Sequence, residues 1–267
     1  MFDISLILLP LFGFIIGVLV TTLGGGGGSL YVPILTLFGV PAQVAVATSL
    51  ATALPTTAVG ALSHHRMGNV DIRTGLILGI GGIIGTLIGA YFANLVPSYI
   101  LKKALGVLLL VMAIPMIRRV LKEREEAKDK DITKKQENND KAATLTGSRR
   151  VIASFFGVAG GILAGVFGLS GTAPVTSGLY SLGLPAVMVV GTTVFVLIFN
   201  SVAGIGGYFL LGRLDLTLIV LLGGGAAVGA FLGPKLLKKI DPKTLEKVYA
   251  PLLVTIMLIM GLAMTLT

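Results

Sequence analysis

Two stretches of this chain combine glycines with hydroxyl side chains in a way that suits anion binding. The first is TTLGGGGGSLYVP, and the second is VFGLSGTAP. Glycine runs hold a helix poorly and let backbone N–H groups approach a ligand closely, while Ser29 and Thr172 are expected to be the N-caps of short helices. Helix N-termini carry partial positive charge and attract anions without a buried Lys or Arg. We therefore predict an anion site at the two breaks, made of Gly27, Gly28, Ser29, Ser170, Gly171 and Thr172. The alternative is that the glycines only let helices pack closely.

Hydroxyl and amide side chains recur on the two apolar stretches that follow these breaks. Thr48 and Ser49 lie in VAVATSLATALPTT, and VVGTTVFVLIFNS carries Thr192, Thr193 and Asn200. Such groups donate hydrogen bonds without bringing charge into lipid, so we add these five residues to the predicted substrate site. The alternative for the hydroxyls is a bond to a carbonyl of their own helix.

Acidic side chains are absent from the interior of every apolar stretch, because Asp3, Asp71, Asp215, Asp241 and Glu246 all fall at ends or turns. A buried carboxylate proton relay is therefore not expected. This leaves uniport as the simplest mechanism. A membrane potential that is negative inside favours anion exit by about 2.3 kcal/mol per charge per 100 mV.

His64 and His65 are the only side chains beside a span that could titrate near neutral pH, and Arg66 follows them. We consider two roles for these three residues. They form either a gate or vestibule for the anion, or an ordinary loop at the membrane interface.

The chain repeats itself at an offset of 144 residues. About three coincidences of glycine with glycine are expected by chance, and the pairs found are 13/157, 17/161, 24/168, 27/171, 39/183, 60/204, 68/212, 79/223, 81/225, 85/229 and 89/233. Two copies of one membrane unit are a common construction of secondary transporters. Glycines spaced by four lie on one helix face, so we assign the glycines at 81, 85 and 89 and their equivalents to helix packing.

The composition is that of an integral membrane protein. Charged residues make up 12% of the chain, far below the soluble average of about 25%, and the mean hydropathy is +0.95. Apolar runs of near-spanning length fall at about 4–23, 42–62, 74–96, 99–117, 151–167, 185–211, 216–234 and 248–266. We predict an all-α fold with eight long transmembrane helices, the first of them retained, and two short half-helices at 29–38 and 173–182. A half-helix of some ten residues is only about 15 Å long, so it must join irregular backbone inside the protein.

The charged stretch 118–150 separates a first transmembrane repeat, 1–117, from a second, 151–267. We expect it to be a cytoplasmic linker whose first part extends the preceding helix. Two topologies compete. If only the long spans cross the membrane, the repeats are parallel, and 14 Lys and Arg residues lie inside the cell and 7 outside. If the short pieces also complete crossings, the repeats are inverted in a 5+5 arrangement, and 18 Lys and Arg residues lie inside and 3 outside. Because basic residues favour the cytoplasmic side, we favour inversion.

The chain resembles the TauE/SafE family of sulfite and sulfonate exporters. The likeness rests on GGGGGSLYVPILTLFGVPAQVAVATSL, HHRMGNVDIRTGL, GGIIGTLIGAYFA, FGLSGTAPVTSGLYSLGLPAVMVVGTT and GRLD, and it covers nearly the whole chain outside the linker. This resemblance implies a multi-pass permease of the cell membrane that exports small sulfur-containing or organic anions through a midplane site at the two breaks. The second half departs from the glycine-rich pattern at Leu169 and Ser170, so a symmetric substrate site is in doubt.

Other classes of function are less well supported. The net charge of +9 lies in loops without interleaved aromatics, which argues against nucleic acid. The absence of cysteine excludes thiol chemistry. We expect no catalytic residue, metal or cofactor, and membrane lipid and a small anion as partners. An anion channel is an alternative, as is an intramembrane serine hydrolase using Ser170 of GLSG, although the only histidines lie in the other half.

Overall fold

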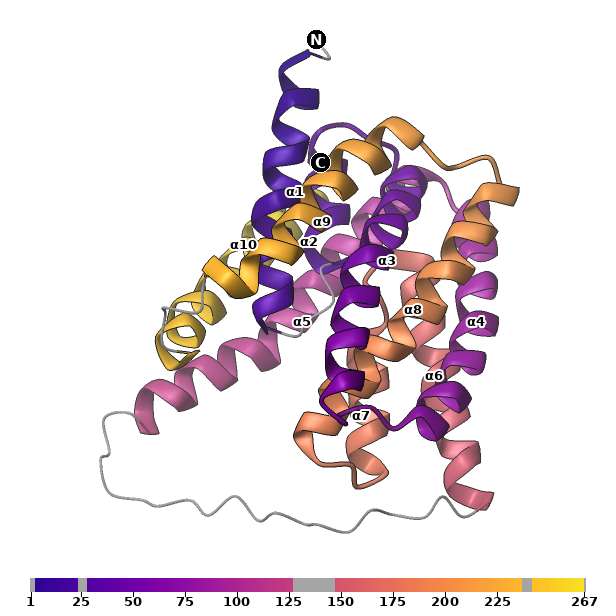
Figure 1. Ribbon diagram of the computed structural model, residues 1–267. Helices are drawn as coiled ribbons and strands as arrows, with labels where there is room; N and C mark the ends of the chain where they lie inside the picture. The colour runs from indigo at the N-terminus through magenta and orange to yellow at the C-terminus, as the bar shows by residue number, and fades with distance from the viewer. Residues whose placement is uncertain (1–2, 24–27, 127–146, 237–241, 267) are drawn as a thin grey trace.

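The computed structural model describes residues 3–23, 28–126, 147–236 and 242–266, and within these ranges the chain forms helices joined by short turns, without strands (Figure 1). The helices are α1 (Asp3–Leu23), α2 (Gly28–Leu37), α3 (Ala42–Arg66), α4 (Ile72–Leu95), α5 (Ser98–Glu126), α6 (Gly147–Phe167), α7 (Thr172–Ser181), α8 (Ala186–Leu210), α9 (Leu216–Leu236) and α10 (Pro242–Leu266). The predicted site residue Gly27 and linker residues 127–146 lie outside the described residues.

The expected short pieces are present as the ten-residue helices α2 and α7. Four helical segments of the described chain are long and apolar enough to cross a membrane: α3, α4, α8 and residues 98–118 of α5. The parts of α1, α6, α9 and α10 whose side chains are described contain shorter apolar segments, at residues 8–18, 152–167, 216–232 and 254–266. The expectation of eight long spans stays a prediction. The chain is a multi-pass membrane protein.

Equivalent helices of the two halves begin 144 residues apart, as 28 and 172 for the short helices and 42 and 186 for α3 and α8 show. The helix ends also correspond. Gly68 after α3 and Gly212 after α8 both have positive φ, at 74° and 63°. In each turn the glycine N–H bonds to a carbonyl three residues earlier, and the next N–H bonds to one five residues earlier, which closes the helix with a Schellman motif.

Helices α3 and α8 cross the centre of the molecule in opposite directions. A Cβ on Gly60 would lie 3.0 Å from Val194, near the end of α3 and the start of α8, whereas one on Gly204 would lie 3.2 Å from the Cβ of Leu50 at the opposite end. In Figure 1 the α3–α4 turn is therefore at the lower end and the α8–α9 turn at the upper end. These two ends are named lower and upper below.

Glycines bring two pairs of parallel helices into backbone contact, and this confirms their expected packing role. Along the α4–α6 seam, a Cβ on Gly81 would lie 2.8 Å from the carbonyl of Ser154, and one on Gly89 would lie 3.1 Å from the Cα of Gly165. The α1–α9 seam repeats this arrangement, with Gly225 against Pro10 and Gly229 against Phe14. Small residues at such seams let backbones approach closely, which gives membrane helices their van der Waals contact.

The short helix α7 folds back against α6. A Cβ on Gly160 would lie 2.8 Å from Val175, and one on Gly178 would lie 2.6 Å from Phe156, so residue numbers fall along α6 as they rise along α7. Residues 168–171 therefore close a helical hairpin inside the bundle, and α7 returns the chain to the lower end, where α8 begins (Figure 1).

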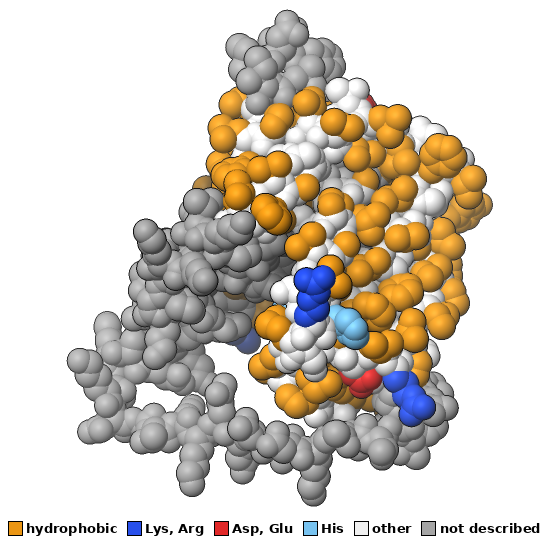
Figure 2. Space-filling model, in the orientation of Figure 1, with side chains coloured by type: hydrophobic (Ala, Val, Ile, Leu, Met, Phe, Trp, Pro, Cys, Tyr) orange, Lys and Arg blue, Asp and Glu red, His pale blue; other side chains and the backbone are white. Residues whose placement is uncertain are grey.

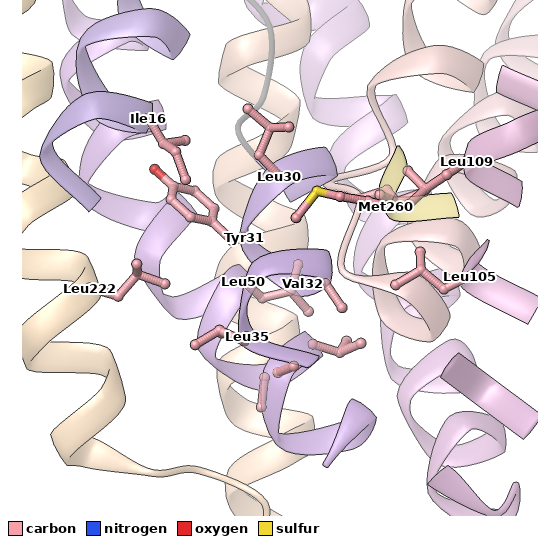
Figure 3. Close-up of a cluster of buried hydrophobic side chains, with 14 of the residues drawn as sticks. Ile16, Leu30, Tyr31, Val32, Leu35, Leu50, Leu105, Leu109, Leu222 and Met260 are labelled. Atoms are coloured by element: carbon pink, nitrogen blue, oxygen red, sulfur yellow. The ribbon is translucent and has the colours of Figure 1, made fainter. Parts of the chain in front are cut away.

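The helix α2 lies in the largest apolar cluster. Tyr31, Val32 and Leu35 are fully buried, with Leu222 of α9 on one side and Leu105 of α5 on the other (Figure 3). On the outside, hydrophobic side chains form a wide band, and the charged side chains visible on this face gather at its lower end (Figure 2). An apolar band above a charged margin suits a protein whose belt faces lipid.

Candidate functional site

The break between α6 and α7, residues 168–171, is irregular backbone within the protein. Gly168, Ser170 and Gly171 have positive φ values of 67°, 60° and 70°. Ser170 is the sole residue other than glycine with positive φ in the described ranges, and it is 1% exposed. An L-residue in this conformation carries strain, which folded proteins keep mainly at functional sites.

The N-cap of α7 is Gly171, and the expectation that Thr172 would cap this helix is wrong. A Cβ at Gly171 would collide with the carbonyl of Gly160 on α6, so the close return of the hairpin requires glycine here. Thr172 is instead the first helical residue, and its buried Oγ1 has no hydrogen-bond partner among the described residues. Similarly, α2 begins at Gly28, which places Ser29 within the first turn rather than at an N-cap before it.

Three carbonyls around the second break accept hydrogen bonds from side chains of neighbouring helices. Tyr208 of α8 donates to the carbonyl of Gly165 at 2.7 Å. Ser49 of α3 donates to that of Gly168 at 2.9 Å. Asn200 of α8 donates through Nδ2 to that of Ser170 at 3.2 Å. The interruption of the helix frees these carbonyls, and the side chains satisfy them where water cannot.

The N–H of Gly168 bonds to the carbonyl of Ala164 at 2.8 Å, whereas the other three N–H groups of the same break are left without such partners. The hydrogen bonds found within the described chain include none donated by the N–H of Leu169, Ser170 or Gly171. The Oγ of Ser170 is also buried and unpartnered there. With the carbonyls of Gly168 and Ser170 occupied, the break offers hydrogen-bond donors and the positive end of α7, a combination that suits an anion.

The threonine equivalents Thr48 and Thr192 lie on α3 and α8, and neither is found to bond to this break. Thr192 accepts a hydrogen bond from the N–H of Asp71 at 3.0 Å, at the start of α4. Thr48 is fully buried with no partner among the described residues. One turn further along α3, the Cα of Thr52 lies 3.8 Å from the position of a Cβ on Gly223 of α9.

Ser49 and Thr193, also equivalent by the repeat, lie toward opposite ends of the central pair. Ser49 contacts Gly168 in the upper part, whereas Thr193 is next to Val194, which packs on Gly60. Eleven residues separate Ser49 from Gly60, which corresponds to about 16 Å along α3. The predicted residues therefore do not form one cluster: Ser49, Ser170, Gly171 and Asn200 come together, and Thr192 and Thr193 lie below them.

The histidines lie at the lower end of α3. A Cβ on Gly191 of α8 would lie 3.1 Å from the Cβ of His64, whose Nδ1 is buried without a partner among the described residues. His65 and Arg66 are exposed. Since Ser170 contacts Asn200, nine residues from Gly191, about 13 Å of helix separates it from His64. This spacing does not suit a Ser–His dyad, which needs hydrogen-bond contact.

The carboxylates Asp71 and Asp215 fall at helix starts, as expected. Asp71 accepts from the N–H of Thr74 at 3.1 Å, and Asp215 from that of Leu218 at 3.1 Å. Both cap their helices, so neither acts inside the bundle. The described residues also contain no group of His, Cys, Asp and Glu that could hold a metal ion.

Several polar residues at the centre were not predicted from the sequence. Tyr208 is fully buried and donates to the carbonyl of Gly165, and Thr86 has a buried hydroxyl without a partner within the described ranges. One feature of the sequence could have identified Tyr208: it lies 144 residues after His64, so it is the repeat equivalent of a residue that was predicted to be functional.

Comparison with known proteins gives a consistent result. The family described as "Sulfite exporter TauE/SafE" matches residues 9–264. The chain is 34% identical to the probable membrane transporter protein YdhB of Bacillus subtilis (strain 168), over 83% of this chain and 86% of YdhB. It is 29% identical to the probable membrane transporter protein MJ0441 of Methanocaldococcus jannaschii, over 98% and 97% of the two chains. YunE of B. subtilis, also a probable membrane transporter protein, is 27% identical over 94% and 96%. No solved structure matches this chain.

Proposed function

Because the chain belongs to the TauE/SafE family of membrane transporters, we propose that it is a permease exporting sulfite or organosulfonates across the cell membrane. One observation carries the proposal. At the second break Ser49 and Asn200 occupy the carbonyls of Gly168 and Ser170, Tyr208 occupies that of Gly165 just before it, and the N–H groups of Leu169, Ser170 and Gly171 are free among the described residues. Such an arrangement attracts an anion without placing a charged side chain in the membrane.

We propose that the substrate site consists of this break with Ser49, Ser170 and Thr172, and that the repeat supplies a counterpart at Gly28, Ser29 and Thr193. The equivalence of Ser49 and Thr193 supports the pairing, because each follows its break at the same position of the repeat. The separation of the two along α3 suggests that an anion passes from one break to the other, rather than resting between them.

The proposed carrier has two inverted repeats of five helices each, with the linker in the cytoplasm. The opposed directions of α3 and α8, the common offset of helix starts and the 18-to-3 division of Lys and Arg support this topology. Because the chain contains no cysteine, single cysteines can test it cleanly. Met67→Cys in the α3–α4 turn and Leu216→Cys after the α8–α9 turn are 58% and 73% exposed positions.

In intact cells, inversion predicts that a membrane-impermeant maleimide labels Leu216→Cys at once and Met67→Cys only after permeabilisation. The parallel arrangement places both turns in the cytoplasm, so protection of both cysteines in intact cells would contradict inversion. The cysteine-free protein is the matched control for background labelling.

Burial of the site favours a carrier over a channel. Ser49, Ser170 and Asn200 are each at most 1% exposed, so the cluster is closed to water from both ends, as an occluded carrier requires. In proteoliposomes, we expect saturable flux of sulfite or methanesulfonate that generates a membrane potential. Ohmic single-channel current would identify a channel, electrically silent flux would require a coupled ion, and no flux of either anion would refute the proposed function.

A further inference from the structure

The second break presents neutral donors only, and no full positive charge accompanies them. Residues 151–212, which contain the break, α7 and α8, include no Lys or Arg, and neither do residues 42–65 of α3. The nearest histidine by helix register, His64, lies about 13 Å away along α8. An anion at this break is therefore balanced by N–H groups, hydroxyls and the end of α7 alone.

The free energy needed to transfer an ion from water into a medium of low polarity rises with the square of its charge. It is therefore about four times larger for a divalent anion than for a monovalent anion of the same size. Attraction to neutral donors rises only in proportion to the charge. The break's supply of donors is small: the N–H groups of Leu169, Ser170 and Gly171, and the buried, unpartnered hydroxyls of Ser170 and Thr172.

We propose that this site accepts monovalent oxyanions and rejects divalent oxyanions of the same size, which makes hydrogen sulfite and organic sulfonates substrates and excludes sulfate and doubly ionised sulfite. The inference rests on the proposed function and specifies the charge state of its substrate. Methanesulfonate and sulfate have nearly the same shape, so the site would distinguish them by charge alone.

The experiment uses the full chain in proteoliposomes held at a fixed potential, with protein-free liposomes as the control for passive entry of sulfur dioxide. Three substrates are compared at several pH values on both sides of the second ionisation of sulfite. Methanesulfonate stays monovalent throughout, sulfate stays divalent, and sulfite changes from one form to the other. Methanesulfonate therefore reports any effect of pH on the protein itself.

We expect methanesulfonate flux that is nearly independent of pH, sulfate flux at least tenfold lower, and sulfite flux that falls about tenfold per pH unit above its second ionisation. Sulfate flux comparable to methanesulfonate, or sulfite flux unaffected by pH, would overturn the inference and leave the proposed function standing. Absence of flux for all three anions would overturn both. As a second readout, methanesulfonate should raise the thermal midpoint of the purified protein and sulfate at equal ionic strength should not; equal shifts would count against the inference.

Discussion

The upper and lower ends of the α3–α8 pair share a backbone design and differ in their hydrogen bonds. At the upper end, Tyr208 and Ser49 donate to carbonyls beside the second break. Their repeat equivalents at the lower end are His64 and Thr193, and the Nδ1 of one and the Oγ1 of the other have no partner within the described ranges.

Further bonds close the upper end. Arg213 in the α8–α9 turn donates to Asn94 of α4 at 2.8 Å, and Gln43 at the start of α3 donates to the carbonyl of Val96 at 2.7 Å. At the lower end, the bond from the N–H of Asp71 to Thr192 links α4 to α8. This difference teaches that equivalent positions of a repeated scaffold can carry side chains of different hydrogen-bonding capacity, as a tyrosine at 208 and a histidine at 64 show. The segments 24–27 and 237–241, which correspond by the repeat to residues 168–171 and 93–97, lie outside the described residues.

The largest effects should come from what the two halves share, the glycine seams. A Cβ at Gly85 would collide with the carbonyl of Val158, and one at Gly229 with that of Phe14. We expect Gly85→Leu and Gly229→Leu each to cost about 1–3 kcal/mol or more, with loss of monodisperse protein in size-exclusion chromatography. Gly206→Leu is the matched control, because a Cβ there meets nothing within 4 Å. Tolerance of leucine at either seam would show that the seam is not closely packed.

Transport should respond next to the hydroxyls beside the breaks. Ser49→Ala removes the donor to the carbonyl of Gly168, and we expect at least about a tenfold loss of methanesulfonate flux, corresponding to about 1.4 kcal/mol. Thr193→Ala should also weaken transport, since we propose it for the lower part of the path. The control Thr57→Ala removes a buried hydroxyl that bonds to the carbonyl of Ala53 in its own helix. Normal kinetics in both test variants, with folded protein, would place the anion elsewhere.

A paired substitution tests the difference between the ends in stability. Tyr208→Phe leaves the carbonyl of Gly165 without its donor and should cost about 1–2 kcal/mol, lowering the thermal midpoint by about 2–4 °C per kcal/mol. His64→Gln at the equivalent lower position should change the midpoint by less than about 1 °C, because the Nδ1 of His64 has no partner among the described residues. Equal shifts for the two variants would contradict the asymmetry.

The smallest effect is expected at the threonine pair of α3 and α8. Thr192→Val removes the acceptor for the N–H of Asp71 and should cost about 1 kcal/mol. Thr48→Val keeps the shape and removes an unpartnered buried hydroxyl, so its cost should be near zero or favourable. Chemical denaturation of the two purified variants would compare them, and a larger loss at Thr48 would reveal a role that the structure does not show.

Most of the fold could be predicted from the sequence, because in lipid the backbone must satisfy its hydrogen bonds locally and apolar length then marks each helix. The expected piece 173–182 is α7, Thr172–Ser181, and the expected span 185–211 is α8, Ala186–Leu210. The charged residues after 118 extend α5 to Glu126, as their spacing indicated.

The site was less predictable, because it depends on register between helices. Because Thr48 and Thr192 are equivalent by the repeat, as are Ser49 and Thr193, all four were predicted to lie in one site. However, α3 and α8 run in opposite directions, so equivalent residues lie toward opposite ends of the pair. The role of Tyr208 depends on where α6 stops beside α8, and no local pattern encodes that distance. The break between α6 and α7 was predicted correctly, since glycine and hydroxyl residues replaced the apolar run there; the corresponding residues 24–27 lie outside the described residues.

The most direct test of the central claim is to locate a bound anion. A structure of the purified protein with bromomethanesulfonate, determined with anomalous data at the bromine edge, would place the ligand independently of any assumption about the site. We predict one sulfonate within hydrogen-bond distance of the N–H groups of Ser170 and Gly171, with bromine toward α3. A sulfonate bound at saturating concentration anywhere away from residues 168–172, with this break filled by side chains, would contradict the account.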